Sequence, residues 1–203
     1  MSDRTAAKRD LKRQRILDAA KRRFGRAGIR ATTIQDIARD ADLAVGTIYQ
    51  FFPDKDALIL AWVDEHRLLI RQQLENVLAL PVSADEKLRE FLRIRFQTVR
   101  MMREVPAIAE ITRAVLRLTP QSIQEMTQTA LGYVRTILEE GRKSRRFPSV
   151  NPEEDTEILF HALAGFFLSN EDPIQPKPDE ATMLRVVDWF ISKWQLPRPK
   201  RQH

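Results

Sequence analysis

The stretch TIQDIARDADLAVGTIYQFFPDK, from Thr33 to Lys55, decides the fold that we predict for this chain. Thr33 can cap a first short helix, with Asp36 as its capping-box partner three residues later. Asp42 tolerates the left-handed conformation that a tight turn requires, and a second short helix follows at about 44–51. This second helix begins with small or short side chains, so it can lie close against a surface in a DNA major groove. The stretch therefore predicts a helix-turn-helix.

The same stretch and the segment before it form a wider pattern with specific spacings. The pattern consists of Arg15, Ile16, Leu17, Asp18, Ala19, Ala20, Phe24, Gly28, Thr33, Ile37, Ala38, Gly46, Thr47, Ile48, Tyr49, Phe52, Lys55 and Leu58. With it, roughly the first third of the chain resembles the TetR (tetracycline-repressor-like) transcriptional regulators. Two positions depart from the family pattern: Asp42 replaces the usual turn glycine, and Ala44 replaces the usual capping serine of the recognition helix. The second departure removes a side-chain cap from that helix.

The composition excludes several classes of protein. The 203 residues contain no cysteine, so disulfides and thiolate metal sites are excluded. No apolar run reaches the roughly 18 residues of a membrane span. The basic N-terminus is not followed by the apolar segment of a signal peptide. We therefore expect a cytoplasmic protein that binds no metal and no cofactor.

Positive charge is concentrated in the N-terminal part of the chain. Residues 1–58 contain 13 Lys and Arg against 8 Asp and Glu, a net charge of +5, whereas the whole chain carries +6. A basic module on a nearly neutral body is expected where one part of a protein meets a polyanion. The charges alone fit a solvated helical surface equally well. Because charge and motif fall in the same segment, we favour double-stranded DNA as the partner.

Helical periodicity, interrupted by prolines and polar clusters, runs along the chain, and no segment alternates like a strand. We expect an all-α fold of nine helices in two domains. The helices are predicted at about 10–27, 34–41, 44–51, 54–80, 84–104, 106–118, 120–145, 152–170 and 179–195. The predicted divisions are a flexible basic arm (1–9), a helix-turn-helix DNA-binding domain (10–58), an effector-binding and dimerisation domain (59–196) and a basic tail (197–203).

The predicted roles within the DNA-binding domain follow from helix geometry and from the resemblance. The first residues of the recognition helix would face base edges, where polar side chains read sequence. Thr33, Tyr49 and Lys55 would hold phosphates, which fix register without reading sequence. The predicted DNA-binding residues are Thr33, Gln35, Val45, Gly46, Thr47, Tyr49, Gln50, Phe51 and Lys55. We expect Phe24, Ile37 and Ile48 to pack together as the core that supports them.

Helix 84–104 carries an arginine on its apolar side. Arg95 falls near the centre of that side on a helical wheel, and a buried arginine requires a partner. Two partners are open: the acid group of an apolar effector, or an internal carboxylate such as Glu110 or Glu157. The resemblance implies an effector pocket in this domain, although methionines and aromatics at helical spacing are equally typical of ordinary core. The candidate ligand-binding residues are Arg95, Phe96, Val99, Met102, Ile111, Met126, Tyr133 and Phe166.

The last two predicted helices are strongly apolar. The run ILFHALAGFFL (158–168) is hydrophobic all round, as expected for a helix between its own core and a partner. The final helix also carries excess apolar surface, and the resemblance implies a four-helix seam in a homodimer. The candidate dimer residues are Phe160, Leu163, Phe167, Val187, Phe190 and Trp194. His161 lies within the run, and we expect it to be a hydrogen-bonded core or interface histidine.

Three functions of different classes remain open. The first is a ligand-responsive, homodimeric repressor that binds a pseudo-palindromic operator and is released by a small, largely apolar effector. The second is a DNA-binding protein without an effector, which the large non-basic body disfavours. The third is an α-helical enzyme. Only three histidines, no cysteine and no helical metal-binding pattern are present, so we predict no catalytic residues.

Overall fold

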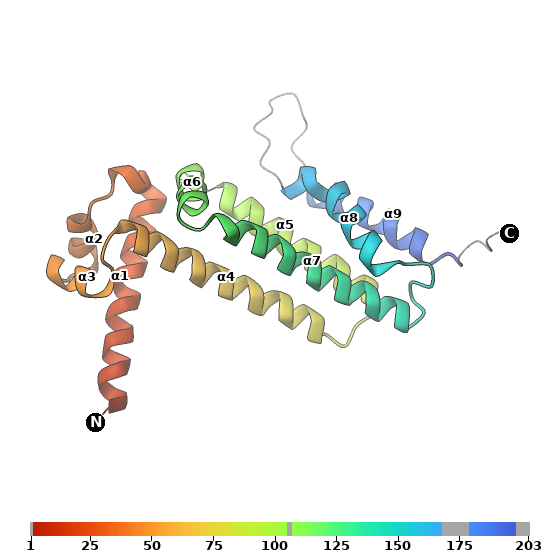
Figure 1. The fold of residues 1–203 in the computed structure, drawn as a ribbon, viewed down its shortest axis with the longest axis horizontal. Helices are drawn as coiled ribbons and strands as arrows, with labels where there is room; N and C mark the ends of the chain where they lie inside the picture. Colours follow the sequence, from red (N-terminus) through yellow and green to blue (C-terminus); the bar gives the residue numbers. More distant parts are fainter. Residues whose placement is uncertain (1, 105–106, 168–178, 198–203) are drawn as a thin grey trace. The chain divides into compact units, whose positions relative to one another are not determined.

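The computed structural model describes residues 2–104, 107–167 and 179–197, except for the side chains of residues 2–4, 122 and 123. Within these ranges the chain forms nine helices and no strand, which confirms the predicted all-α fold (Figure 1). None of the described helices is both long and apolar enough to span a membrane. The chain divides into two compact units, Met1–Leu69 with Glu104–Ile123 and Ile70–Arg103 with Gln124–His203.

The first unit is assembled around α1 (Ser2–Ala31). The two helices of the predicted helix-turn-helix are α2 (Ile34–Ala41) and α3 (Val45–Phe51); α2 lies against α1, and α3 against α2 (Figure 1). Phe24, Ile37 and Ile48 are fully buried in one cluster, as predicted. The Trp62 ring, from the first part of α4 (Lys55–Ala79), stacks on the Phe24 ring with centroids 6.3 Å apart.

The course of α1 differs from the prediction at its start. The helix begins at Ser2 rather than at residue 10, so the segment interpreted as a flexible basic arm is helical. The physical reason is local, because the run Ala6-Ala7-Lys8-Arg9 consists of strong helix formers. Near the other end, Gly28 adopts φ 81° and ψ 166°, a backbone conformation that glycine adopts more readily than other residues.

The first unit also contains α6 (Ile108–Leu118), which packs on α1. One face of α6 buries Ala107, Ile111 and Val115, and partly buried side chains of Ile29, Trp62 and Val63 pack against it. The unit therefore extends beyond residue 58, the boundary predicted from the sequence. It also means that Ile111, a candidate ligand-binding residue, belongs to the first unit.

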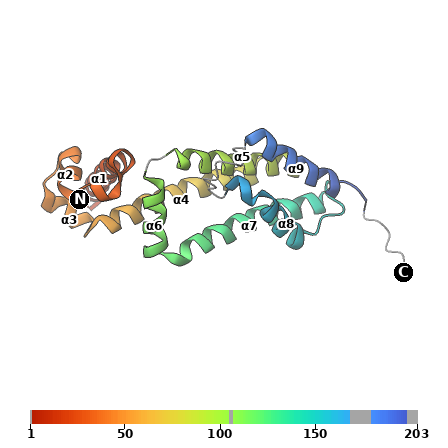
Figure 2. The same cartoon turned by 90° about the horizontal axis from the view of Figure 1, so that it is seen from above.

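The second unit contains α5 (Ala84–Arg103), most of α7 (Pro120–Lys143), α8 (Pro152–Phe167) and α9 (Glu180–Trp194). Helix α5 contacts α8 and α9, and α8 contacts α9; Figure 2 shows α9 beside α5. The largest fully buried side chains include Phe91 of α5 and Phe147, which follows α7. The predicted residues 168–170 of α8, the loop at 171–178 and the basic tail beyond residue 197 lie outside the described residues.

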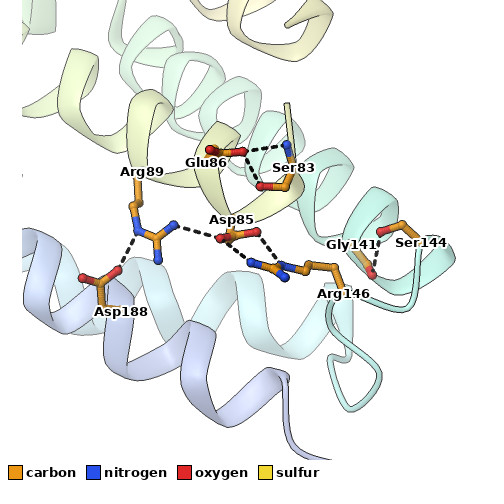
Figure 3. A network of polar contacts seen from close by, with 8 residues as sticks. All are labelled: Ser83, Asp85, Glu86, Arg89, Gly141, Ser144, Arg146 and Asp188. Atoms are coloured by element: carbon orange, nitrogen blue, oxygen red, sulfur yellow. Dashed lines mark hydrogen bonds and ion pairs between the residues drawn. The ribbon is translucent and has the colours of Figure 1, made fainter. Parts of the chain in front are cut away.

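A buried carboxylate holds three segments of the second unit together (Figure 3). Asp85 of α5 is 4% exposed and accepts two hydrogen bonds from Arg146, Nε to Oδ1 at 2.7 Å and Nη2 to Oδ2 at 3.1 Å. Arg89 donates to Asp85 at 3.0 Å and to Asp188 of α9 at 2.7 Å. The Arg146 guanidinium, followed by that of Arg89, holds the pKa of Asp85 well below its usual range. The network thus links α5 to α9 and to the segment after α7.

Candidate functional site

The helix-turn-helix is built on local hydrogen bonds that the sequence specifies. The Thr33 hydroxyl accepts a bond from the Asp36 amide at 3.1 Å, and the Asp36 carboxylate accepts one from the Thr33 amide at 3.2 Å, which completes the predicted capping box. Asp42 ends α2 in the left-handed conformation, φ 51° and ψ 53°, with its amide donating to the carbonyls of Ala38 and Arg39. The predicted capping box at the start of α2 and the predicted left-handed turn residue at its end are therefore both confirmed.

Two arginines of α1 fix the position of α2, a role that the sequence analysis missed. Arg15 Nη2 donates to the Ala41 carbonyl at 2.7 Å, and Arg23 makes two bonds to the Asp40 carboxylate at 2.6 and 2.7 Å. A bidentate arginine–carboxylate pair fixes orientation as well as distance. The Arg23 guanidinium also lowers the pKa of Asp40. Part of the positive charge of α1 is thus used to hold the motif together.

Helix α3 has three exposed residues, three half-buried residues and one buried residue. Its N-cap Ala44 makes no side-chain cap, as predicted, and only the Ala44 carbonyl closes the first turn, by accepting from the amides of Thr47 and Ile48. Ile48 is its one buried residue, and the Tyr49 side chain is 51% exposed. Gly46 and Gln50 are also exposed, whereas Val45, Thr47 and Phe51 are half-buried. The exposed side of α3 therefore carries Gly46, Tyr49 and Gln50, whereas Val45 and Phe51 pack against the core of the first unit.

Positive charge from α1 lies beside the end of this helix. The Arg9 guanidinium lies 5.9 Å from the centroid of the Phe51 ring, and the Arg13 guanidinium lies 5.3 Å from that of the Phe52 ring. Both arginines are exposed, and neither forms an ion pair within the described part of the chain. Their charges are therefore available beside α3. In the sequence, Arg9 belongs to the predicted flexible basic arm (1–9), and no role is predicted for Arg13.

Two of the three predicted phosphate-binding residues, Thr33 and Lys55, already have partners within the first unit, whereas the third, Tyr49, is exposed. The Thr33 hydroxyl donates to Asp36 at 2.7 Å. Lys55 Nζ donates to the carbonyls of Ile29 at 2.8 Å and Thr32 at 2.9 Å, which uses two of its three N–H donors. Phosphate binding by Lys55 thus stays a prediction for its remaining N–H. Gln35, the other predicted contact outside α3, is exposed.

Glu110 of α6 binds the same segment, residues 28–32, that Lys55 binds. We call this segment, together with Lys55 and Glu110, the corner of the first unit. Glu110 Oε2 accepts hydrogen bonds from the amides of Ile29 at 2.8 Å and Arg30 at 3.2 Å. Gly28 makes this approach possible, because a Cβ built there would lie 3.3 Å from Glu110 Oε2 and 3.4 Å from Oε1. The Thr32 hydroxyl adds a bond to the Gly28 carbonyl at 2.7 Å.

The proposed internal partners of Arg95 do not pair with it. Glu110 belongs to the corner just described, and Glu157 is exposed on α8. Within the described residues, the contact recorded for the Arg95 guanidinium is with the Phe167 ring, 5.9 Å from its centroid. Burial lowers the pKa of Arg95. The interpretation of Arg95 as half of an internal ion pair with either carboxylate is therefore wrong.

Apart from Ile111, which lies on α6 of the first unit, the other candidate ligand-binding residues are spread over three helices of the second unit. On α5, Phe96 is buried in the core of the unit, and Val99 and Met102 are half-buried. On α7, Met126 is exposed and the Tyr133 hydroxyl donates to Glu75 at 3.2 Å. Phe166 of α8 packs on the core, and its carbonyl accepts a long bond from Arg103 at 3.5 Å.

Three of the six candidate dimer residues face the interior of the protomer. Leu163, Val187 and Trp194 are 1%, 0% and 4% exposed, so they cannot present side chains to a partner, and these assignments are wrong. The apolar face of α9 on which Val187 and Trp194 lie is the face that packs into its own core. The remaining candidates, Phe160, Phe167 and Phe190, are exposed or half-buried.

An outward-facing second helix of a helix-turn-helix, beside unpaired arginines on a basic module, defines a class of proteins: the helix-turn-helix transcriptional regulators. Residues 16–62 match the profile of a family described as bacterial regulatory proteins, tetR family. Residues 16–62 therefore form a DNA-binding domain of the tetR-family type.

Similar proteins cover nearly the whole chain. The uncharacterized HTH-type transcriptional regulator YhgD of Bacillus subtilis is 25% identical over 185 residues, which cover 88% of this chain and 93% of YhgD. Two solved structures share the fold. A transcriptional regulator from Saccharomonospora viridis in complex with choline has a TM-score of 0.69 at 20% identity, covering 90% of this chain and 96% of that chain. FadR from Bacillus subtilis in complex with stearoyl-CoA has a TM-score of 0.61 at 22% identity, covering 89% and 98%.

Proposed function

We propose that this transcriptional regulator is a repressor that binds a pseudo-palindromic operator as a homodimer and is released by a small, largely apolar effector. The observation that carries the DNA-binding part is the exposure of α3, on which Ile48 alone is buried. Its outward residues include Gln50, which can read a base edge, and Tyr49, which can hold a phosphate. Arg9 and Arg13 supply sequence-independent attraction beside it.

Exposed apolar side chains on α8 and α9 support the homodimer. Ile158 and Phe160 of α8 are 45% and 38% exposed, and Trp189 of α9 is 56% exposed. Large apolar groups on two adjacent helices favour an isologous interface, in which the same surface of each subunit meets its symmetry mate. A two-fold symmetric dimer then presents two recognition helices to two half-sites, which is why a pseudo-palindromic operator follows.

The effector part of the proposal is supported by the fold and by the apolar second unit. Two proteins of the same fold bind small molecules, choline in one and stearoyl-CoA in the other. In this chain, α5 carries the half-buried residues Val99 and Met102, which suit an apolar ligand. The effector releases DNA only to the extent that it binds the released conformation more tightly than the DNA-bound one.

Fluorescence anisotropy tests the proposal with DNA from upstream of the protein's own gene and with an unrelated duplex of equal length. At near-physiological salt, a sequence-specific regulator prefers the first duplex by about a thousandfold or more. Equal, salt-sensitive binding to both duplexes would contradict sequence-specific repression and support a DNA-binding protein without an operator. A small molecule that abolishes the specific signal would identify the effector.

A matched pair of glutamine variants tests whether α3 is the helix that recognises the DNA sequence. Gln50→Ala removes an exposed side chain from α3, and Gln128→Ala removes an equally exposed one from α7, outside the first unit. We expect Gln50→Ala to reduce the preference for the operator by about tenfold or more, the usual cost of one lost base contact. Gln128→Ala should leave the preference unchanged. Equal effects of the two variants would show that α3 does not read the DNA.

A further inference from the structure

Arg95 is a cation in apolar surroundings. It is partly buried on α5, between the buried residues Leu92 and Phe96 and the half-buried Val99. Its guanidinium lies over the ring of Phe167, a residue that packs on the core of the second unit. A guanidinium always carries its charge and has five N–H donors to satisfy.

The neighbouring arginines of the same helix differ from Arg95 in having carboxylate partners. Arg89 pairs with Asp85 and Asp188, and Arg93 pairs with Glu90 and with Glu180 at 3.1 Å. No carboxylate pairs with Arg95 within the described part of the chain, and the two carboxylates suggested by the sequence lie elsewhere. Helix α5 therefore contains partnered arginines on its polar side and one without an anion on its apolar side.

A partly buried charge without a counter-ion destabilises a protein, because the desolvation of the guanidinium is not offset by a partner. Contact with the face of an aromatic ring recovers only part of this loss. A methionine in this position would fill similar volume without that penalty. An arginine there is explained if an anion from outside the chain completes the site.

We propose that the effector carries an anionic group and that Arg95 binds this group. The inference rests on the proposed function, since it names the chemical class of the effector acting on the second unit. The apolar residues beside Arg95 fit an alkyl or ring portion, and the planar guanidinium fits a carboxylate or a phosphate through two parallel hydrogen bonds. A cationic effector such as a quaternary ammonium compound is unfavourable beside this charge.

Four amphiphiles with the same decyl chain test the proposal by isothermal titration calorimetry below their micelle concentrations. The head groups are a carboxylate (decanoate), a phosphate (decyl phosphate), a neutral hydroxyl (decanol) and a cation (decyltrimethylammonium). We expect at least one anionic probe to bind the wild-type protein about tenfold or more tightly than decanol, and the cation to bind more weakly than decanol. The two anionic probes separate a carboxylate effector from a phosphate effector.

Variants at Arg95 separate a ligand site from a structural role. Arg95→Met should bring the anionic and neutral probes to within about threefold of each other, while the melting temperature of the ligand-free protein stays equal or rises. Arg95→Lys should restore part of the anion preference, because it restores the charge but not the planar fork. Arg93→Met is the control, since it removes a paired guanidinium from the same helix; it should leave the preference intact.

Two outcomes would overturn the assignment. The first is a wild-type protein without preference for either anionic probe over decanol, including one that binds none of the four. The second is an Arg95→Met variant that melts at a lower temperature and keeps the preference, which would make Arg95 structural. Operator binding is measured separately. If the protein showed an anion preference that depends on Arg95 but bound no operator, the proposed function would be refuted and the anion site would remain. If it bound an operator but showed no such preference, only the anion site would be refuted.

Discussion

Replacing Gly28 with alanine tests how much the hydrogen bonds of Glu110 to the end of α1 stabilise the first unit. Gly28 has φ 81° and ψ 166°, a backbone conformation that costs other residues about 1–3 kcal/mol. The added Cβ would also lie 3.3 Å from Glu110 Oε2, the oxygen that accepts the Ile29 and Arg30 amides. Losing even one bond to a charged group costs about 1.5–3 kcal/mol. We expect Gly28→Ala to reduce the free energy of unfolding by about 3 kcal/mol.

A second glycine of the same helix supplies the control. Gly25 has nothing within 4 Å of its Cβ position, and it lies in the helical part of α1. Gly25→Ala should therefore increase the free energy of unfolding by about 0.5–1 kcal/mol. The measurement is urea-induced unfolding followed by circular dichroism, with operator affinity measured on the folded variants.

The reasoning about Gly28 fails if the two alanine variants have the same unfolding midpoint. A double-mutant cycle with Glu110→Gln locates the cause more narrowly. If the Cβ acts by displacing the Glu110 carboxylate, the effects of Gly28→Ala and Glu110→Gln are less than additive. Strict additivity would assign the whole loss to the backbone conformation of residue 28.

Two further changes concern the second unit. Asp85→Asn should lower the free energy of unfolding by about 2–3 kcal/mol, and the more exposed Asp188→Asn by less than about 1 kcal/mol, both measured in urea. The pKa of Asp85 is lowered in the folded protein, so its contribution to the free energy of unfolding is present above about pH 4 and is lost as the pH falls towards the folded-state pKa. If the wild-type protein and Asp85→Asn lost stability equally on acidification, this assignment would be contradicted. Trp189→Glu should convert the homodimer that we propose to a folded monomer in size-exclusion chromatography with light scattering, whereas Leu80→Glu, also at an exposed apolar residue, should not.

The sequence predicts the helix-turn-helix well because its determinants are local. Thr33 and Asp36 are three residues apart, and Asp42 sets the turn by its own backbone conformation. The contacts that were missed join distant residues: Arg23 with Asp40, and Glu110 with the Ile29 amide. Nothing in a single sequence specifies which of many charged residues meet when helices pack.

The dimer residues show a different limit of sequence patterns. Periodicity indicates which residues share a face of a helix, but it does not indicate what covers that face. Val187 and Trp194 share the apolar face of α9, and that face is covered by the protomer's own core. Trp189 is not among the predicted interface residues, yet it is 56% exposed. In the homodimer that we propose, the exposed Trp189 is therefore a better candidate for the interface than the buried Val187 and Trp194.

Lys55 shows why a family motif alone does not define a residue's role. A lysine at the start of α4 fits the pattern of a phosphate contact, yet its ammonium bonds to the carbonyls of Ile29 and Thr32. The Ile29 amide, in turn, bonds to Glu110 of α6. One N–H of Lys55 remains, so the predicted phosphate contact would add a third bond to an ammonium that already joins α4 to the end of α1. A phosphate at this position would therefore help to keep the Lys55 ammonium bonded to the Ile29 and Thr32 carbonyls. Conversely, a change that breaks these two bonds would move the ammonium away from the phosphate. The predicted phosphate contact would thus couple the stability of this part of the first unit to the affinity for DNA through one side chain.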